Sequence, residues 1–166
     1  MRSTASWWGS RFRQFRAHLW ARVAPGERAG LGAWTTPAQL ALVESMHVAD
    51  RRHGLDVVAS LRAGNVTEPE ALLAGLLHDA GKGATGVWPR VAYALGDRYG
   101  HWVWRVAAVI PGFARHLERL RTHAQTSAEL AKAAGCPART VELIRFQDEP
   151  RDAEFGELLR LADEAN

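Results

Sequence analysis

The segment ALLAGLLHDAGKG, residues 71–83, is the strongest constraint on how this chain can fold. Seven residues, nearly all apolar helix formers, lead directly into His78 and Asp79, so both side chains are expected to reach the protein interior. Burying even a neutral polar group without a hydrogen bond costs roughly 2–7 kcal/mol, and an unpaired charge costs more. The rest of the chain must therefore bring partners to these two side chains.

Prolines and glycines divide the rest of the chain into short helical segments. Thr36 followed by Pro37 predicts the start of one helix, and Gly64 predicts the end of another. Gly135 and Pro137 separate two later helices in the same way. On this basis helices are expected at about 37–46, 49–63, 88–99, 101–109, 112–121, 124–134 and 137–147, and from about 152 to near the C-terminus.

The helix that carries His78 is expected to begin at Thr67-Glu68-Pro69-Glu70, which has the spacing of a capping box, and to end at Gly81 and Gly83. Only residues 103–110, VWRVAAVI, have the β-branched and aromatic density typical of a strand. Because this segment has no partner strand, it too is expected to be helical. The sequence therefore predicts an all-α fold.

The composition is that of an ordinary globular protein. Of the 166 residues, 47 % are hydrophobic and 23 % are charged, which is typical of a soluble chain with a single main domain. Cys136 is the only cysteine, so neither an internal disulfide nor a cysteine-rich zinc site can form. No apolar run approaches the roughly 20 residues of a membrane span, and the N-terminus lacks the apolar core of a signal peptide. We therefore expect a cytoplasmic protein.

The positive charge is concentrated at one end of the chain. The net charge is +3, but residues 1–28 carry six arginines against one glutamate, whereas the remaining residues carry 15 basic and 17 acidic side chains. A nucleic-acid-binding domain usually carries a basic face across its whole surface. The even charge of residues 29–166 therefore argues against a specific nucleic-acid partner.

Residues 7–23 are expected to form a basic amphipathic helix, followed by a linker over residues 24–32. Pro25 and several glycines in the linker are expected to interrupt any helix. The apolar stripe is expected to dock on the body of the protein or on a second subunit of a homo-oligomer, and the alternative is contact with an anionic membrane surface. The stripe consists of Trp8, Phe12, Phe15, Leu19 and Val23.

Two further ionisable residues are expected to point towards His78 and Asp79. His53 lies in the preceding helix, and the last helix places Asp163 beside its inner stripe of Phe155, Leu158, Leu159 and Ala162. A single histidine on an apolar face is most simply a satisfied core residue, but carboxylates beside it favour a metal site. Mixed imidazole and carboxylate ligands suit Mn, Fe, Zn or Ni.

These motifs resemble the HD-domain metal-dependent phosphohydrolases. The segments DRRHGLDV, LLHDAGKG and LLRLADEAN match the family's first, central and last motifs in order, and the resemblance covers about residues 46–163. The resemblance implies an all-helical bundle that holds one divalent transition metal, which would be Mn, Fe, Ni, Co or Zn. It implies the metal ligands His53, His78, Asp79 and Asp163.

The resemblance also bears on a second metal ion. The segment RTHAQTSAELAKAAG is similar to the one that supplies a further histidine in many members, and this residue would be His123. The next histidine of that pattern is replaced by Gln147, a weak neutral ligand, and the adjacent Asp148 is a candidate substitute with a different direction on the helix. The sequence therefore favours one metal ion over two.

The implied activity is hydrolysis of a nucleotide or another small phosphate ester by a metal-activated water. The resemblance assigns catalytic roles to Asp79, Lys82 and His123, with Lys82 beside the substrate phosphate. The alternatives are a solvated helix-end position for Lys82 and a surface or core position for His123. A catalytically decayed domain that serves as a ligand-binding or signalling module is the alternative function.

Other polar residues near the motifs have less specific expectations. His47 is an alternative to His53 as a metal ligand, whereas Asp50 and Asp56 are expected to face solvent. Three tryptophans are expected in the core or in an interface, with stacking on a nucleobase as the alternative: Trp88, Trp102 and Trp104. Three arginines flank the proposed ligands and are candidates to bind phosphate: Arg51, Arg52 and Arg121.

Overall fold

The computed structural model describes residues 21–83 and 85–166, and this part of the chain contains helices and no strand, which confirms the predicted all-α class. Residues 103–110 accordingly contain a helix rather than a strand. The α-helices are α2 (Pro25–Leu31), α3 (Pro37–Ser45), α4 (Val48–Ala63), α5 (Pro69–Leu77), α6 (Val87–Tyr99), α7 (Trp102–Ala107), α8 (Phe113–Arg121), α9 (His123–Ala133), α10 (Ala138–Arg145) and α11 (Gly156–Ala165). A short 3-10 turn, η1 (Ala80–Lys82), follows α5.

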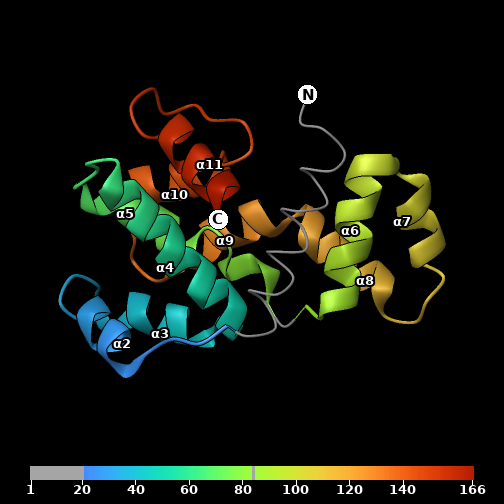
Figure 1. Cartoon of the computed structure of the whole chain (residues 1–166), viewed down its shortest axis with the longest axis horizontal. Coiled ribbons are helices and arrows are strands. Elements are labelled where there is room, and N and C mark those ends of the chain that lie inside the picture. Colours follow the sequence, from blue (N-terminus) through green and yellow to red (C-terminus); the bar gives the residue numbers. More distant parts are fainter. Residues whose placement is uncertain (1–20, 84) are drawn as a thin grey trace.

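Helix α5 is the centre of the main bundle. Every residue from Ala71 to Leu77 is buried, as expected for a helix that is apolar on all sides. Helices α4, α10 and α11 pack against it, and α9 covers the η1 turn that follows it (Figure 1). The apolar run of the sequence is therefore the core of the bundle, and the residues at its end are held inside the protein.

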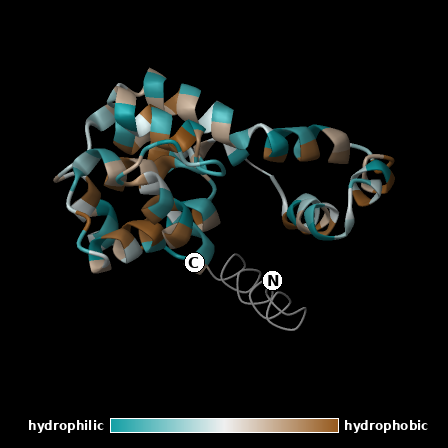
Figure 2. Ribbon diagram, turned by 90° about the horizontal axis from the view of Figure 1, so that it is seen from above, coloured by the Kyte–Doolittle hydropathy of each residue, from teal (hydrophilic) through white to brown (hydrophobic). Residues whose placement is uncertain are grey.

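Helices α6, α7 and α8 form a separate three-helix unit, residues 87–121, which we call the arm. The three helices pack on one another, and α8 joins the arm to the bundle through contacts with η1 and α9. Figures 1 and 2 show the arm extending away from the bundle, with α7 at its far end. None of the helices between residues 21 and 166 that the structure describes combines the length and the apolar content of a bilayer-spanning segment.

The N-terminal part of the described chain differs from the predicted linker. The helix predicted for residues 7–23 falls largely outside the described residues, and residues 21–23 are not helical. The predicted linker is wrong, because Pro25 begins α2 at a position where a missing amide is tolerated. Glu27 accepts a hydrogen bond from the Ala24 amide at 2.8 Å, and its carboxylate pairs with Arg52 of α4.

Two further local predictions are wrong, those for Thr67 and for Leu158. Thr67 does not form a capping box, because Glu68 is the N-terminal cap of α5, without a side-chain hydrogen bond, and Pro69 begins the helix. Leu158 faces solvent, since the inner side of α11 is formed by Leu159 and Ala162. Of the tryptophans predicted to lie in the core or in an interface, Trp88 and Trp102 are exposed on the arm and do not lie in the core.

Gly54 allows α4 to approach α5 closely enough for their histidines to meet. A Cβ atom at this position would lie 2.5 Å from the carbonyl oxygen of Leu76, which is shorter than any real contact. With only hydrogen there, the rings of His53 and His78 lie 5.1 Å apart between centroids. The absence of a side chain at this one residue therefore helps to bring the two imidazoles together.

We expect Gly54→Ala to lower the free energy of unfolding by about 1–3 kcal/mol, since the added methyl group forces the two helices apart. Gly30→Ala in α2 is the matched control, because a Cβ at Gly30 meets nothing within 4 Å. Urea unfolding followed by circular dichroism measures both. Equal stabilities of the two variants would contradict the close approach of α4 and α5.

Candidate metal centre

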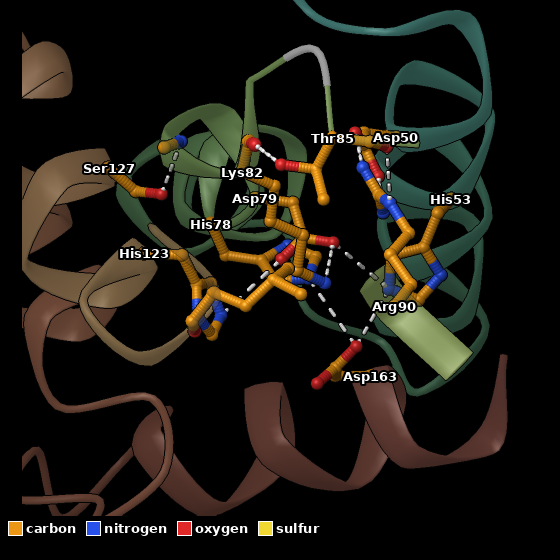
Figure 3. A network of polar contacts seen from close by, with 12 residues as sticks. Asp50, His53, His78, Asp79, Lys82, Thr85, Arg90, His123, Ser127 and Asp163 are labelled. Atoms are coloured by element: carbon orange, nitrogen blue, oxygen red, sulfur yellow. Dashed lines mark hydrogen bonds and ion pairs between the residues drawn. The ribbon is translucent and has the colours of Figure 1, made fainter. Parts of the chain in front are cut away.

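His78 and Asp79 lie where α5 ends and η1 begins. His78 is the C-terminal cap of α5, with its amide bonded to the Ala74 carbonyl at 2.9 Å, and Asp79 precedes the 3-10 turn. Both residues are almost completely buried, with 1 % and 2 % of their surface exposed. The change of helix type directs the two side chains to the same place, where Nε2 of His78 is 3.5 Å from Oδ1 of Asp79 (Figure 3).

His53 from α4 and Asp163 from α11 complete the cluster. Oδ1 of Asp163 lies 2.7 Å from Nε2 of His53 and 3.4 Å from Nε2 of His78. Oδ2 of Asp79 lies 4.0 Å from Nε2 of His53. Ligand atoms that share one transition-metal ion are about 3–4 Å apart. The ligand atoms of His53, His78 and Asp163 all lie within 4.8 Å of one another, so this cluster could hold a metal ion.

The hydrogen bonds of the cluster leave ligand atoms available. Nδ1 of His78 donates to the carbonyl of Gly75 at 2.9 Å, which directs Nε2 towards Asp79 and Asp163. Nε2 of His78 and Oδ1 of Asp79 are both buried, and neither has a hydrogen-bond partner in the described part of the chain. A buried polar atom without a partner is costly, and a histidine oriented by a carbonyl is a common arrangement of metal ligands.

The cluster attracts positive charge. Burial lowers the pKa of His78, but the carboxylates of Asp79 and Asp163 outweigh it and raise this pKa to about 9. Burial raises the pKa values of the two carboxylates. The charges of His78 and Lys82 outweigh burial and lower the pKa of Asp79, and the hydrogen bond with His53 and the charge of His78 lower that of Asp163. At neutral pH His78 therefore carries a proton, which a metal ion would have to replace.

Lys82 supplies a second positive charge to the cluster. Its Nζ lies 2.6 Å from Oδ2 of Asp79, because η1 returns the chain to the same side three residues later. Burial lowers the pKa of Lys82, but the charge of Asp79 raises it further, so the ammonium group is retained. Its side chain is 23 % exposed, so it can also be reached from solvent.

His123 lies next to the cluster as a neutral imidazole. Its Nδ1 donates to the Leu120 carbonyl at 2.6 Å, so Nε2 has a lone pair, which accepts a hydrogen bond from Nε2 of Gln147 at 2.8 Å. Burial and the charge of Lys82 lower the pKa of His123. The lone pair that a second metal ion would need is thus occupied by Gln147, and Nε2 is 3.7 Å from Oδ1 of Asp79.

The sequence does not indicate the ion pair of Asp50 and Arg90, which holds the loop after η1. Asp50 was expected to face solvent, but it is buried and accepts two hydrogen bonds from Arg90, both at 2.7 Å. Arg90 also donates to the carbonyl of Thr85, whose hydroxyl donates to the carbonyl of Lys82. Asp50 precedes His53 by three residues, and its partner is 40 residues away, a separation that local patterns do not reveal.

Several candidate residues do not join the cluster. His47 caps the start of α4 through Nδ1, so His53 is the histidine that α4 contributes. Arg52 pairs with Glu27 and Asp56, and Arg121 pairs with Glu118. Asp148, considered as a substitute ligand, is exposed.

Comparisons with protein-family models, with curated proteins and with solved structures found no match for this chain. Four side chains from three separate parts of the chain meet, and the most buried ligand atoms among them have no hydrogen-bond partner among the residues that the structure describes.

We expect the purified protein to bind roughly one equivalent of Mn or Co, and Asp79→Ala to abolish this binding. The substitution removes the buried carboxylate that faces both imidazoles. Equilibrium dialysis with metal analysis measures the stoichiometry, and thermal unfolding with and without metal provides a second measure, because a bound ion stabilises only the folded state. The apparent affinity should rise with pH up to about 9, since the proton on His78 competes with the metal.

Asp97→Ala is the matched control, because this carboxylate lies exposed on α6. Asp163→Asn provides an independent test if Asp79→Ala fails to fold. Metal retention in both Asp79→Ala and Asp163→Asn, equal to that of the control, would rule out this site.

Proposed function

We propose that this chain is a metal-dependent phosphohydrolase that acts on a nucleotide or another small phosphate ester. The observation that carries the proposal is the convergence of His53, His78 and Asp163 beside the buried Asp79, with ligand atoms that lack partners among the described residues. The resemblance of the surrounding motifs to HD-domain phosphohydrolases supports the same function.

The residues present fit a divalent transition metal. Two imidazoles and two carboxylates suit Mn, Fe, Ni, Co or Zn better than Mg or Ca, which prefer ligand sets made only of oxygen. A metal ion held by these four residues would lower the pKa of a bound water and offset the charge that develops on phosphorus. Because Gln147 occupies the lone pair of His123, we propose a site for one ion.

Lys82 is proposed to bind the substrate phosphate. It is held beside Asp79, yet part of its side chain is accessible, so a phosphate oxygen arriving next to the ligand cluster would meet its ammonium group. A lysine acts on phosphate as a compact point charge with three donors. The same side chain would then neutralise a carboxylate before substrate binds and an oxyanion afterwards.

His123 is proposed to border the substrate site as a neutral imidazole. Its lowered pKa and its donation to Leu120 leave it neutral, with Nε2 as an acceptor. A neutral imidazole in this state has no proton to give at Nε2. Since Gln147 already donates to that nitrogen, His123 is proposed to shape the site beside Asp79 rather than to act as a general acid.

The second candidate function is a ligand-binding or signalling module that has lost catalysis. The contact between Gln147 and His123 favours it, because it removes a position that could otherwise bind metal or substrate. The two functions differ in one outcome. A module would hold the metal ion and bind a phosphorylated ligand without converting it.

The test is a panel of nucleotides, cyclic dinucleotides and simple phosphoesters, each assayed for hydrolysis with Mn, Ni, Co and Mg. We expect turnover of at least one of them, and we expect Lys82→Met to lower it by roughly 100- to 1,000-fold, the usual effect of removing one group that stabilises transition-state charge. Lys132→Met in α9 is the matched control, since Lys132 is exposed and is the only other lysine.

Metal content is measured on every variant, so that loss of activity is separated from loss of the ion. A fully loaded protein that turns over no compound of the panel would overturn the hydrolase proposal and favour the binding module. Equal activity of the Lys82 and Lys132 variants would remove only the role of Lys82.

A further inference from the structure

The far end of the arm carries a continuous set of exposed apolar side chains. Trp102 and Val106 are one helical turn apart on α7, and Val109 and Ile110 follow in the turn after it. Tyr99 adjoins them at the end of α6, where its carbonyl accepts a hydrogen bond from the Trp102 indole at 3.0 Å. These five residues, which we call the α7 patch, are between 47 % and 82 % exposed.

The α7 patch is not needed for the packing of the arm itself. The inner side of α7 is formed by Trp104 and Ala107. The Trp104 ring stacks on Tyr93, and its indole donates to the Tyr93 carbonyl at 3.0 Å. A Cβ at Gly96 would overlap this ring, so the two helices are already in close contact. The exposed side chains therefore lie on the outer side of a completed core.

The arm is also the basic part of the described structure. Residues 87–121 contain six arginines and two carboxylates, a net charge of +4, whereas the rest of residues 29–166 has a net charge of −6. Arg105 lies on α7 between Trp102 and Val106, and Arg98 lies over the Tyr99 ring at 5.9 Å from its centroid. Neither arginine has an ion-pair partner among the residues that the structure describes.

The positive charge of the arm argues against covering the α7 patch with another part of this chain or with a second copy of it. A second copy bound through the same face would place two basic patches together. Residues 1–28 carry a net charge of +5, which does not complement the charge of the patch. The acidic bundle of a second copy offers few apolar contacts, because its exposed large hydrophobic residues between residues 29–83 and 122–166 are Leu130, Leu158 and Leu161.

We infer that the α7 patch binds the surface of an anionic lipid bilayer. Tryptophan and tyrosine favour the headgroup region, and exposed aliphatic side chains favour the boundary of the acyl chains. Arginines beside them are attracted by anionic headgroups. This surface is separate from the cluster of His53 and Asp163, and the inference does not depend on the proposed hydrolysis.

The test measures binding of the full chain to vesicles by co-sedimentation. Vesicles of phosphatidylcholine alone are compared with vesicles that also contain phosphatidylglycerol, at low and high salt. The test variant combines Val109→Asp with Ile110→Asp, and the matched control combines Leu158→Asp with Leu161→Asp on α11. Both variants change exposed residues and alter the net charge equally, and both keep residues 1–28 intact.

We expect the unaltered protein and the control to bind the anionic vesicles, to bind those of phosphatidylcholine only weakly, and to dissociate at high salt. The Val109/Ile110 variant should bind the anionic vesicles at least about tenfold more weakly. Arg105→Glu should also weaken binding, which tests the charge separately from the apolar residues.

Three results would overturn the inference. The first is equal binding of the Val109/Ile110 variant and the control, and the second is no binding of the unaltered protein to either vesicle. The third is a concentration-dependent dimer, seen by light scattering, that is lost in the Val109/Ile110 variant but not in the control. That result would assign the patch to a second copy of the chain.

Discussion

The structure depends on how the negative charges of Asp79 and Asp163 are balanced where α5 ends. The two carboxylates come from segments more than 80 residues apart, and both contact His78 in an interior from which water is largely excluded. Like charges in such an environment repel strongly, and each carries a desolvation cost. In the protein without metal, Lys82 and a proton on His78 provide the balancing positive charge, and a metal ion can take over this role from both. A divalent cation would replace the proton and free Lys82 for another anion, which is the physical basis of the proposed phosphate chemistry.

The remainder of the bundle keeps this arrangement in place. Helix α5 is buried on all sides, so its last residue cannot turn towards solvent without disrupting the core. Gly81 allows η1 to pack closely on α9, as Gly54 does for α4 and α5, since a Cβ at Gly81 would lie 2.5 Å from the His123 carbonyl oxygen. The Gly81 amide also donates to the Ser127 hydroxyl at 2.8 Å. The buried ion pair of Asp50 and Arg90 holds the loop that connects the cluster to the arm. Close backbone packing and one buried ion pair therefore determine where the ligand atoms lie.

Much of this architecture follows from local signals in the sequence. Thr36 and Pro37 begin α3 with a capping hydrogen bond, Gly64 ends α4, and the apolar run before His78 is the core helix, because each signal acts on neighbouring residues. The meeting of His53, His78 and Asp163 was also predicted from helical periodicity and from the resemblance of the motifs. The predictions that failed concern partners that no local pattern specifies. In the sequence, Asp50 looks like a surface acid, because its partner Arg90 lies 40 residues further along the chain. Pro25 is compatible with both a linker and the first turn of a helix. For Trp102 the sequence leaves both the core and an interface open, because both sides of the short helix α7 carry large apolar residues.

The most direct measurement is the position of the metal itself. Crystals of the full chain grown with Co, and measured at the cobalt absorption edge, give an anomalous difference map that locates the ion independently of any assumption about ligands. We expect one strong peak per chain, in contact with Nε2 of both His53 and His78 and with carboxylate oxygens of Asp79 and Asp163. A map with no peak at these residues, from a protein shown to contain cobalt, would contradict the proposed metal site.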